Sequence, residues 1–128
     1  MLHKLLADYL SEIESILLSL ENIYIERYIE EIQTNNRVNL RIRIRWSTEY
    51  LLEINEVIIV ENNSLMTLDY RYHCQDYQNN LVFRYDSTPH FPELVSFPHH
   101  KHLKTEVIAC EKPSIAQVLE EVVTLNKN

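Results

Sequence analysis

Apolar residues near both ends of the chain recur at three- and four-residue steps, which is the pattern of amphipathic helices. In residues 2–20 the apolar positions are Leu2, Leu5, Leu6, Tyr9, Leu10, Ile13, Ile16, Leu17 and Leu20. In residues 114–125 the apolar positions are Ile115, Val118, Leu119, Val122 and Val123. Ser114 and Gln117 have the spacing of a capping box at the start of this helix. Each end therefore predicts a helix that packs its apolar face on the intervening segment.

Between the two predicted helices the period changes to two, which is typical of half-buried strands. These alternating runs are residues 40–46, 51–61, 66–75 and 81–86. Asn-Asn, which tolerates positive φ and so suits hairpin turns, occurs at 35–36, 62–63 and 79–80. Residues 23–33 fit either helix or strand, and the turn that follows them favours strand. A further short strand is expected at 105–110.

These elements predict an α+β fold, with an antiparallel sheet meander of about five or six strands packed against an N-terminal and a C-terminal helix. At 128 residues the chain is expected to form one domain. Its expected parts are an N-terminal helix (2–20), a sheet (23–86), a Pro/His-rich loop (87–104) and a C-terminal helix (114–125).

Matching the apolar faces across each predicted hairpin sets a register for the sheet. The predicted pairs are Glu30–Arg41, Tyr28–Arg43, Glu26–Arg45, Ile44–Leu52, Arg43–Glu53, Ile54–Tyr72, Glu53–His73, Asn55–Arg71, Cys74–Tyr85, His73–Asp86 and Gln75–Arg84. One face becomes apolar, and the other gathers Arg43, Glu53, Arg71, His73, Arg84 and Asp86. Cross-strand ion pairs explain part of this set without any function. A histidine between two carboxylates, with arginines nearby, also suits acid–base chemistry and anion binding.

Composition limits the classes of function. The net charge of −7 means that any binding of nucleic acid needs a local basic patch. The chain contains no glycine, which excludes the Gly-rich phosphate-binding loops. Cys74 and Cys110 form no CxxC motif and are expected to be buried reduced thiols. No apolar run is long enough to span a membrane, and acids interrupt the N-terminal apolar stretch, so a cytoplasmic protein is expected.

The stretch PHFPELVSFPHHKH (89–102) holds four of the six histidines and three of the four prolines. On a strand, His100-x-His102 would project both rings to one side, and His90 or Asp86 could complete a zinc site with them. The alternative is an acid–base site, in which the loop folds over the polar sheet face and brings its imidazoles to arginines and carboxylates. For the acid–base site the candidate residues are His73, Asp86, His99, His100 and His102, with Arg71, Arg84 and His90 binding substrate.

Three blocks of the chain resemble a bacterial family, namely YRYHCQD (70–76), FRYDSTPHFPEL (83–94) and FPHHKH (97–102). With the closing KPSIAQVLEE they are similar to the TumE family of toxins from toxin–antitoxin operons, over about residues 37–123. The chain departs from the family at Ser87-Thr88, where Asn-Ala is frequent, and at Phe91, where histidine is frequent.

The resemblance implies a small growth-inhibiting toxin that is encoded with a DNA-binding antitoxin. By analogy with other small toxins, RNA is the expected target. The leading hypothesis is a metal-independent, ribonuclease-like toxin that cleaves RNA or otherwise blocks translation and is neutralised by its antitoxin. The alternative is a non-catalytic binding or regulatory module with zinc as its cofactor, for which the metal ligands are His90, His100 and His102. The sequence leaves open whether the chain forms a homodimer.

Overall fold

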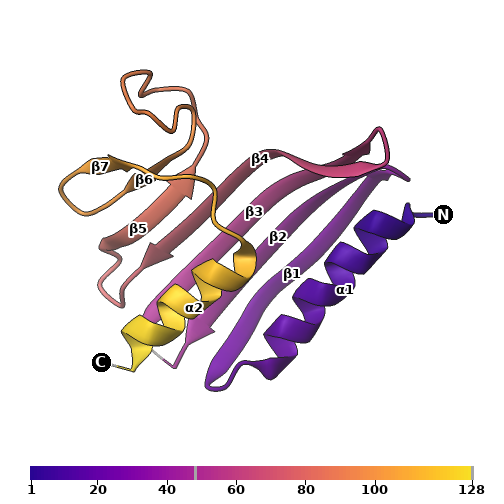
Figure 1. Ribbon diagram of the computed structural model, residues 1–128. Helices are drawn as coiled ribbons and strands as arrows, with labels where there is room; N and C mark the ends of the chain where they lie inside the picture. Colours follow the sequence, from indigo (N-terminus) through magenta and orange to yellow (C-terminus); the bar gives the residue numbers. More distant parts are fainter. Residues whose placement is uncertain (48, 128) are drawn as a thin grey trace.

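A computed structural model gives the fold and describes residues 1–47 and 49–127 (Figure 1). Along the chain the elements are α1 (Lys4–Ser19), β1 (Ile23–Thr34), β2 (Arg37–Trp46), β3 (Tyr50–Glu61), β4 (Ser64–Gln75), β5 (Leu81–Asp86), β6 (His100–His102), β7 (Val107–Ala109) and α2 (Ile115–Asn126). The strands form a seven-stranded antiparallel sheet whose spatial order is the chain order. The predicted α+β meander between two helices is therefore confirmed. The count exceeds the predicted five or six because β6 lies within residues 87–104, which the sequence pattern predicts as a loop.

Both helices pack on the same face of the sheet, where one hydrophobic core joins them (Figure 1). The buried helix residues are Leu6, Leu10, Ile13 and Leu17 of α1 and Ile115, Val118, Leu119 and Val122 of α2. The predicted capping box is present, since Ser114 and Gln117 bond to each other's backbone N–H groups. Because strand residues alternate in direction, the residues between the core positions form a second face, away from the helices. This second face is called the outer face below.

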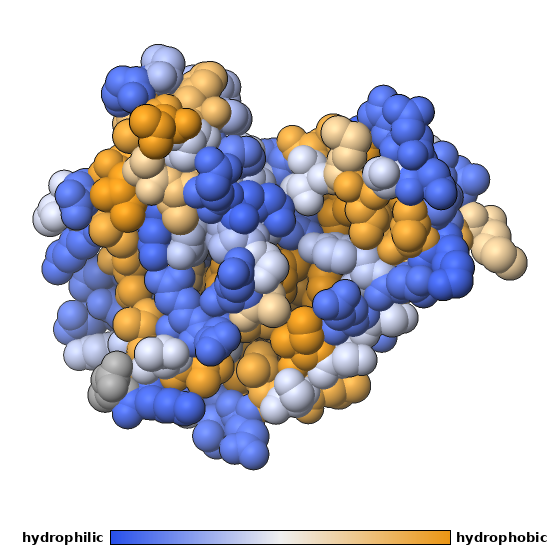
Figure 2. All heavy atoms as spheres, viewed as in Figure 1, coloured by the Kyte–Doolittle hydropathy of each residue, from blue (hydrophilic) through white to orange (hydrophobic). Residues whose placement is uncertain are grey.

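The loop between β5 and β6 is tied down at one end and exposed at its tip. In the space-filling view hydrophobic side chains show at the top left, where this loop lies, and Val95 and Phe97 of the loop are exposed (Figure 2). Ser96 is buried, and its hydroxyl donates to the carbonyl of His99 and accepts from the N–H of Cys110. These bonds hold the chain that enters β6 against the chain that leaves β7.

The predicted register is confirmed across the centre of the sheet. Ile44 pairs with Leu52 and Arg43 with Glu53 between β2 and β3. Between β3 and β4 the predicted pairs are also present, namely Ile54–Tyr72, Glu53–His73 and Asn55–Arg71. The predicted loop at Ser47–Glu49 includes Thr48, which lies outside the described residues.

The predicted register is wrong between β1 and β2. Glu30 pairs with Leu40 rather than Arg41, and Tyr28 pairs with Ile42. An irregularity between Ile32 and Thr34 shifts the pairing by one residue, as a β-bulge does, and a second one follows between Ile25 and Arg27. A bulge adds a residue to one strand only, and the hydropathy pattern carries no mark of it.

The predicted register is also wrong between β4 and β5. His73 pairs with Arg84 rather than Asp86, and Asp86 pairs with Arg71. Two features cause the difference. A loop at 76–80, where the Asp76 carboxylate accepts from the backbone N–H groups of residues 78 and 80, replaces the two-residue turn, and the register shifts between Cys74 and Gln75. From Cys74 to Arg71 the pairing differs from the predicted one by two residues, so the predicted faces of the sheet are preserved there. Asn62 and Asn63 do form the expected turn, both with positive φ.

Candidate functional site

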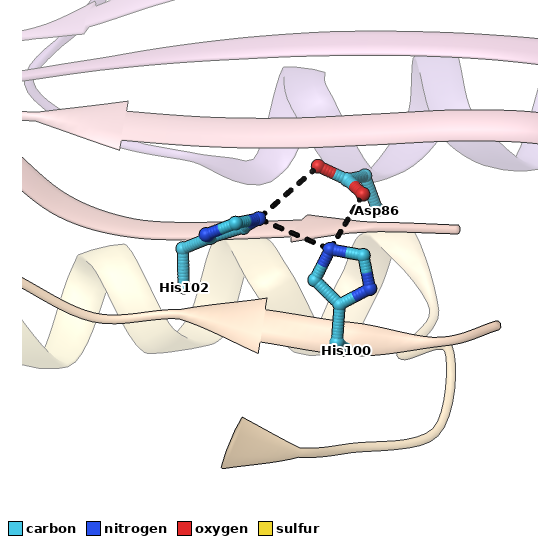
Figure 3. Close-up of side chains that lie close together, drawn as sticks. All are labelled: Asp86, His100 and His102. Atoms are coloured by element: carbon cyan, nitrogen blue, oxygen red, sulfur yellow. Dashed lines mark hydrogen bonds and ion pairs between the residues drawn. The ribbon is translucent and has the colours of Figure 1, made fainter. Parts of the chain in front are cut away.

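Asp86, His100 and His102 come together on the outer face of the sheet (Figure 3). Strand β5 ends at Asp86, and β6 pairs with it so that His100 lies opposite Asp86 and His102 lies opposite Arg84. Residues two apart on a strand point to the same side, so both imidazoles face the carboxylate. These three residues are called the imidazole–carboxylate group below.

The group is compact and mostly buried. The Nε2 atom of His100 lies 2.9 Å from Oδ1 of Asp86 and 3.0 Å from Nε2 of His102. The Nε2 atom of His102 lies 3.7 Å from Oδ2 of Asp86. His100 is 1 % exposed and Asp86 is 6 % exposed, whereas 24 % of the His102 side chain is exposed. Solvent therefore reaches the group through His102.

Neighbouring backbone and aromatic groups fix the three side chains in place. The Nδ1 atom of His100 lies 2.9 Å from the carbonyl oxygen of Pro98, and because a carbonyl only accepts, Nδ1 is the donor. The N–H of Thr88 donates to Oδ1 of Asp86. The ring of Phe91 contacts both imidazoles edge-on. Burial lowers the pKa of His102, although the charge of Asp86 opposes this effect. The lowered pKa favours the neutral ring, which has a lone pair on one nitrogen.

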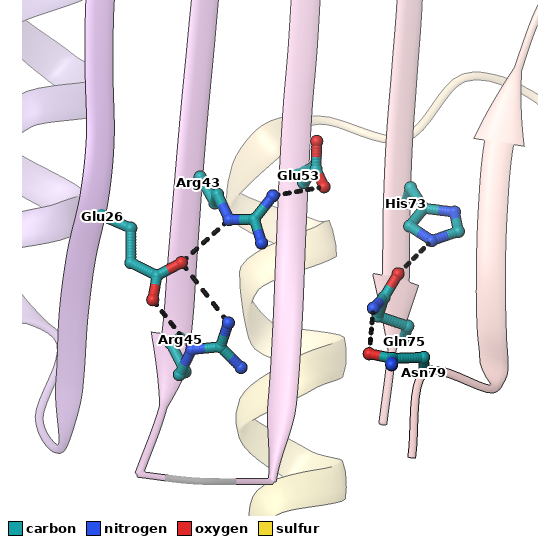
Figure 4. Close-up of polar contacts among 7 residues, drawn as sticks. All are labelled: Glu26, Arg43, Arg45, Glu53, His73, Gln75 and Asn79. Carbon is teal, nitrogen blue, oxygen red and sulfur yellow. Dashed lines mark hydrogen bonds and ion pairs between the residues drawn. The ribbon is translucent and has the colours of Figure 1, made fainter. Parts of the chain in front are cut away.

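His73 does not join the group. The Nε of Arg84 donates to Nδ1 of His73 at 3.2 Å. The Nε2 atom of His73 lies 3.0 Å from the accepting Oε1 of Gln75 (Figure 4). Both ring nitrogens are therefore used in hydrogen bonds of the neutral ring. Burial is the largest cause that lowers the pKa of His73, and the charges of Arg84 and Arg71 add to it. This histidine, predicted to lie opposite Asp86, has the contacts of a structural residue.

Two arginines of β2, Arg43 and Arg45, form an ion-paired ladder with two glutamates (Figure 4). Glu26 accepts from Nε of Arg43 at 2.8 Å and from Nε of Arg45 at 2.9 Å, and Arg43 also donates to Glu53 at 3.0 Å. Hydrogen bonds from Arg45 and Arg43 lower the pKa of Glu26. Cross-strand ion pairing accounts for this ladder, so these arginines are not counted as site residues.

The other predicted histidines are not members of the group. Nδ1 of His99 lies 2.8 Å from the hydroxyl of Tyr70, a core residue, so this ring turns away from His100. His90 is exposed in the loop that follows β5. The predicted metal ligands are His90, His100 and His102. In the structure Asp86, and not His90, is the third residue beside the two imidazoles.

The outer face also carries a polar cleft of about 360 Å³. Its side chains come from alternate positions of β2, β3 and β4, namely Asn39, Arg41, Asn55, Val57, Asp69 and Arg71. Arg71 links the cleft to the group, because it lies opposite Asp86. Guanidinium groups bind phosphate well, so the cleft offers an anion a place next to the imidazoles.

One buried acid was not expected from the sequence. Glu56 is 2 % exposed on the helix-covered face, where the hydroxyls of Tyr9 and Tyr72 donate to its carboxylate. Its position could have been recognised, since residue 56 falls in phase with the buried Ile54 and Ile58. Tyr72 and Tyr85 are buried, as the register predicts.

The comparison with protein families identifies the chain. The family model described as Toxin TumE matches residues 7–127 of the 128-residue chain. The protein belongs to the TumE toxin family. Neither a curated protein nor a solved structure matches it.

The TumE match extends the predicted resemblance into α1. All three residues of the imidazole–carboxylate group lie in the blocks 83–94 and 97–102, on which the resemblance to TumE toxins was based. None of the described helices is long and apolar enough to cross a membrane.

Proposed function

We propose that this TumE-family toxin arrests growth by cleaving RNA at its outer face and that a cognate DNA-binding antitoxin holds it inactive. The observation that supports this proposal is the imidazole–carboxylate group, which is buried at His100 and open to solvent at His102. Buried ionisable groups that converge beside a cleft are typical of catalytic sites.

RNA is a suitable substrate for the groups that lie nearby. Attack by a 2′-hydroxyl needs a proton acceptor, a proton donor for the leaving oxygen and positive charge near the phosphate. His102, at the open side of the group, is placed to accept or donate a proton in this reaction. Arg71 and Arg84 lie opposite Asp86 and His102 on neighbouring strands and supply the charge. Because the chain carries a net charge of −7, this attraction is local to the outer face.

A growth assay tests the role of the site. The chain is expressed without an antitoxin, alongside Asp86→Asn and His102→Gln, and we expect both variants to lose growth arrest. The control is His3→Asn, which changes a histidine at the N-cap of α1 and keeps a good capping residue there. Circular dichroism checks that each variant folds. Growth arrest by both folded variants at the wild-type level would overturn the proposed site.

A cleavage assay tests the substrate. The purified chain is incubated with a labelled RNA oligonucleotide and with DNA of the same sequence, which lacks the 2′-hydroxyl. We expect only the RNA to be cut, and Arg71→Ala to cut it more slowly. RNA that is bound by the wild-type chain but never cut would favour the competing proposal, a non-catalytic binding module.

Co-expression tests the partner. If the neighbouring gene encodes the antitoxin, its product restores growth and purifies together with this chain. Light scattering of the chain alone then distinguishes a monomer from a homodimer. A neighbouring gene that leaves growth arrest unchanged would contradict the proposed neutralisation.

A further inference from the structure

We propose that Asp86, His100 and His102 bind one divalent transition-metal ion, with zinc as the expected ion. The three side chains each offer one possible ligand atom, and these atoms lie within 4.8 Å of one another. This proposal concerns the same residues as the proposed function, but it does not require RNA to be the substrate.

The hydrogen positions around His100 show why a cation belongs here. Its Nδ1 atom donates to the carbonyl of Pro98, so in the neutral ring Nε2 carries a lone pair and no hydrogen. That lone pair faces the carboxylate oxygen of Asp86 at 2.9 Å, which is a contact between two acceptors. If Nε2 of His102 carries a hydrogen, it can donate to Nε2 of His100 at 3.0 Å, but this leaves the contact between His100 and Asp86 without a hydrogen. The contact with Asp86 thus calls for a proton or a metal ion.

One metal ion can contact all three side chains at once, whereas one proton can join only two of them. A proton on Nε2 of His100 lies between two acceptors at nearly equal distances, and it leaves His102 and Asp86 3.7 Å apart, too far for a hydrogen bond. Atoms that each lie about 2.1 Å from one ion are about 3.0 Å apart at octahedral angles and about 3.4 Å apart at tetrahedral angles. The two contacts of His100 Nε2, at 2.9 Å to Oδ1 of Asp86 and 3.0 Å to Nε2 of His102, match the octahedral value. The 3.7 Å contact joins His102 to the second carboxylate oxygen, Oδ2, so His102 and Asp86 must move slightly closer to hold one ion.

The surroundings of the group match those of bound metals. Histidine ligands in proteins usually donate their second ring N–H to a carbonyl or carboxylate, as His100 does to Pro98. Ligating carboxylates are hydrogen-bonded in turn, as Asp86 is by the N–H of Thr88. Imidazole with carboxylate suits zinc and iron rather than calcium or magnesium.

Three protein ligands leave a coordination position free, and that is the arrangement of catalytic rather than structural zinc sites. The free position lies on the side of His102, where the group meets solvent. A zinc-bound water there has a lowered pKa and can act as the base in the proposed RNA cleavage. The metal-independent chemistry expected from the sequence would then give way to metal-assisted chemistry.

Metal content tests the proposal directly. Untagged full-length chain is purified without chelators, dialysed against Zn²⁺ and analysed by mass spectrometry of the elements. We expect one zinc per chain, and a rise in melting temperature that a chelator reverses. We expect Asp86→Asn and His102→Gln to weaken zinc binding at least about 100-fold, because even the loss of an outer hydrogen bond costs 10–100-fold. The matched control is His99→Gln, which changes the neighbouring imidazole on the opposite face and keeps one zinc.

Two outcomes would overturn the proposal, namely a folded wild-type chain that binds no zinc and zinc binding that neither variant weakens. Cobalt as a second probe reports the ligands, since Co²⁺ held by these side chains gives visible absorption bands that the two variants lack. The growth assay separates the two proposals. Variants that lose zinc yet still arrest growth would support the metal site and refute the function at this site. A wild-type chain that binds no zinc yet cuts RNA would refute the metal site and support the function.

Discussion

The sheet buries one carboxylate on each face, and the two differ in their partners. Glu56, on the helix-covered face, accepts hydrogen bonds from the hydroxyls of Tyr9 and Tyr72. Asp86, on the outer face, has two imidazole nitrogens beside it, and the nearer one carries a lone pair in the neutral ring. Two tyrosine hydroxyls of the core satisfy Glu56, whereas the contact of Asp86 with His100 requires a proton or, as we propose, a metal ion.

The tyrosines remain donors at any ordinary pH. Burial and the nearby carboxylate raise the pKa of both Tyr9 and Tyr72, so neither hydroxyl gives up its proton. Burial alone therefore does not make an acid a functional residue. What the neighbouring atoms can donate separates a structural carboxylate from a site.

Exchanging the two acids for uncharged residues should give opposite results, and this is the largest effect we expect. Glu56→Leu leaves two hydroxyls in the core without an acceptor and should lower the free energy of unfolding by about 2–5 kcal/mol. Asp86→Asn keeps the shape of the side chain, so it should cost less stability while it removes growth arrest and zinc binding. Urea unfolding of both variants measures the first effect. A Glu56→Leu chain as stable as the wild type would show that the comparison is mistaken.

Removing one hydroxyl at a time should sharpen the result at Glu56. Tyr72→Phe removes a donor from a fully buried site and should cost about 1–3 kcal/mol. Tyr9→Phe should cost less, because Tyr9 is only half-buried and water can replace its hydroxyl. Thermal unfolding of the two variants gives the order. A larger loss for Tyr9→Phe would mean that Tyr72 is not the main donor.

The sequence predicts the parts of the fold that depend on periodicity. Both helices and the central register follow from the spacing of apolar residues, because a one-residue slip would expose the apolar face. The β1–β2 pairs and the 76–80 loop could not be predicted, since an extra residue at Ile32–Thr34 and the bonds of Asp76 are local backbone events.

The three residues of the imidazole–carboxylate group could be predicted to share a face for the same reason. His100 and His102 share a face because they lie two apart on a strand, and Asp86 shares it because the register error was even. The contacts of His73 and His99 could not be predicted from the sequence. His73 bonds to Gln75 and His99 to Tyr70, and these contacts depend on the local path of the loops that follow β4 and precede β6.

His73 extends the comparison to imidazoles, and its effect should be smaller. The pKa of His73 lies below its ordinary value of 6.5, chiefly through burial. The unfolded chain then takes up a proton at this residue before the folded chain does, so the stability from neutral His73 is present above 6.5 and lost as pH falls through the lower folded value. His73→Gln should therefore lose less stability than the wild type between about pH 7.5 and about pH 5.5, by at most about 1.4 kcal/mol per pH unit.

Urea unfolding at the two pH values measures this difference between wild type and His73→Gln. Groups elsewhere titrate alike in both chains and cancel in the difference. Equal losses of stability in the two chains would mean that His73 ionises as readily when folded as when unfolded.

The exposed acid Glu26 should show the smallest effect of all. It is as well paired as Glu56, with two guanidinium groups, yet water surrounds the ladder and screens it. Glu26→Gln should therefore change stability least among these variants, and the change should shrink as salt is added. Urea unfolding at low and high salt measures both effects. A large, salt-independent loss would show that pairing at the surface matters as much as pairing in the core.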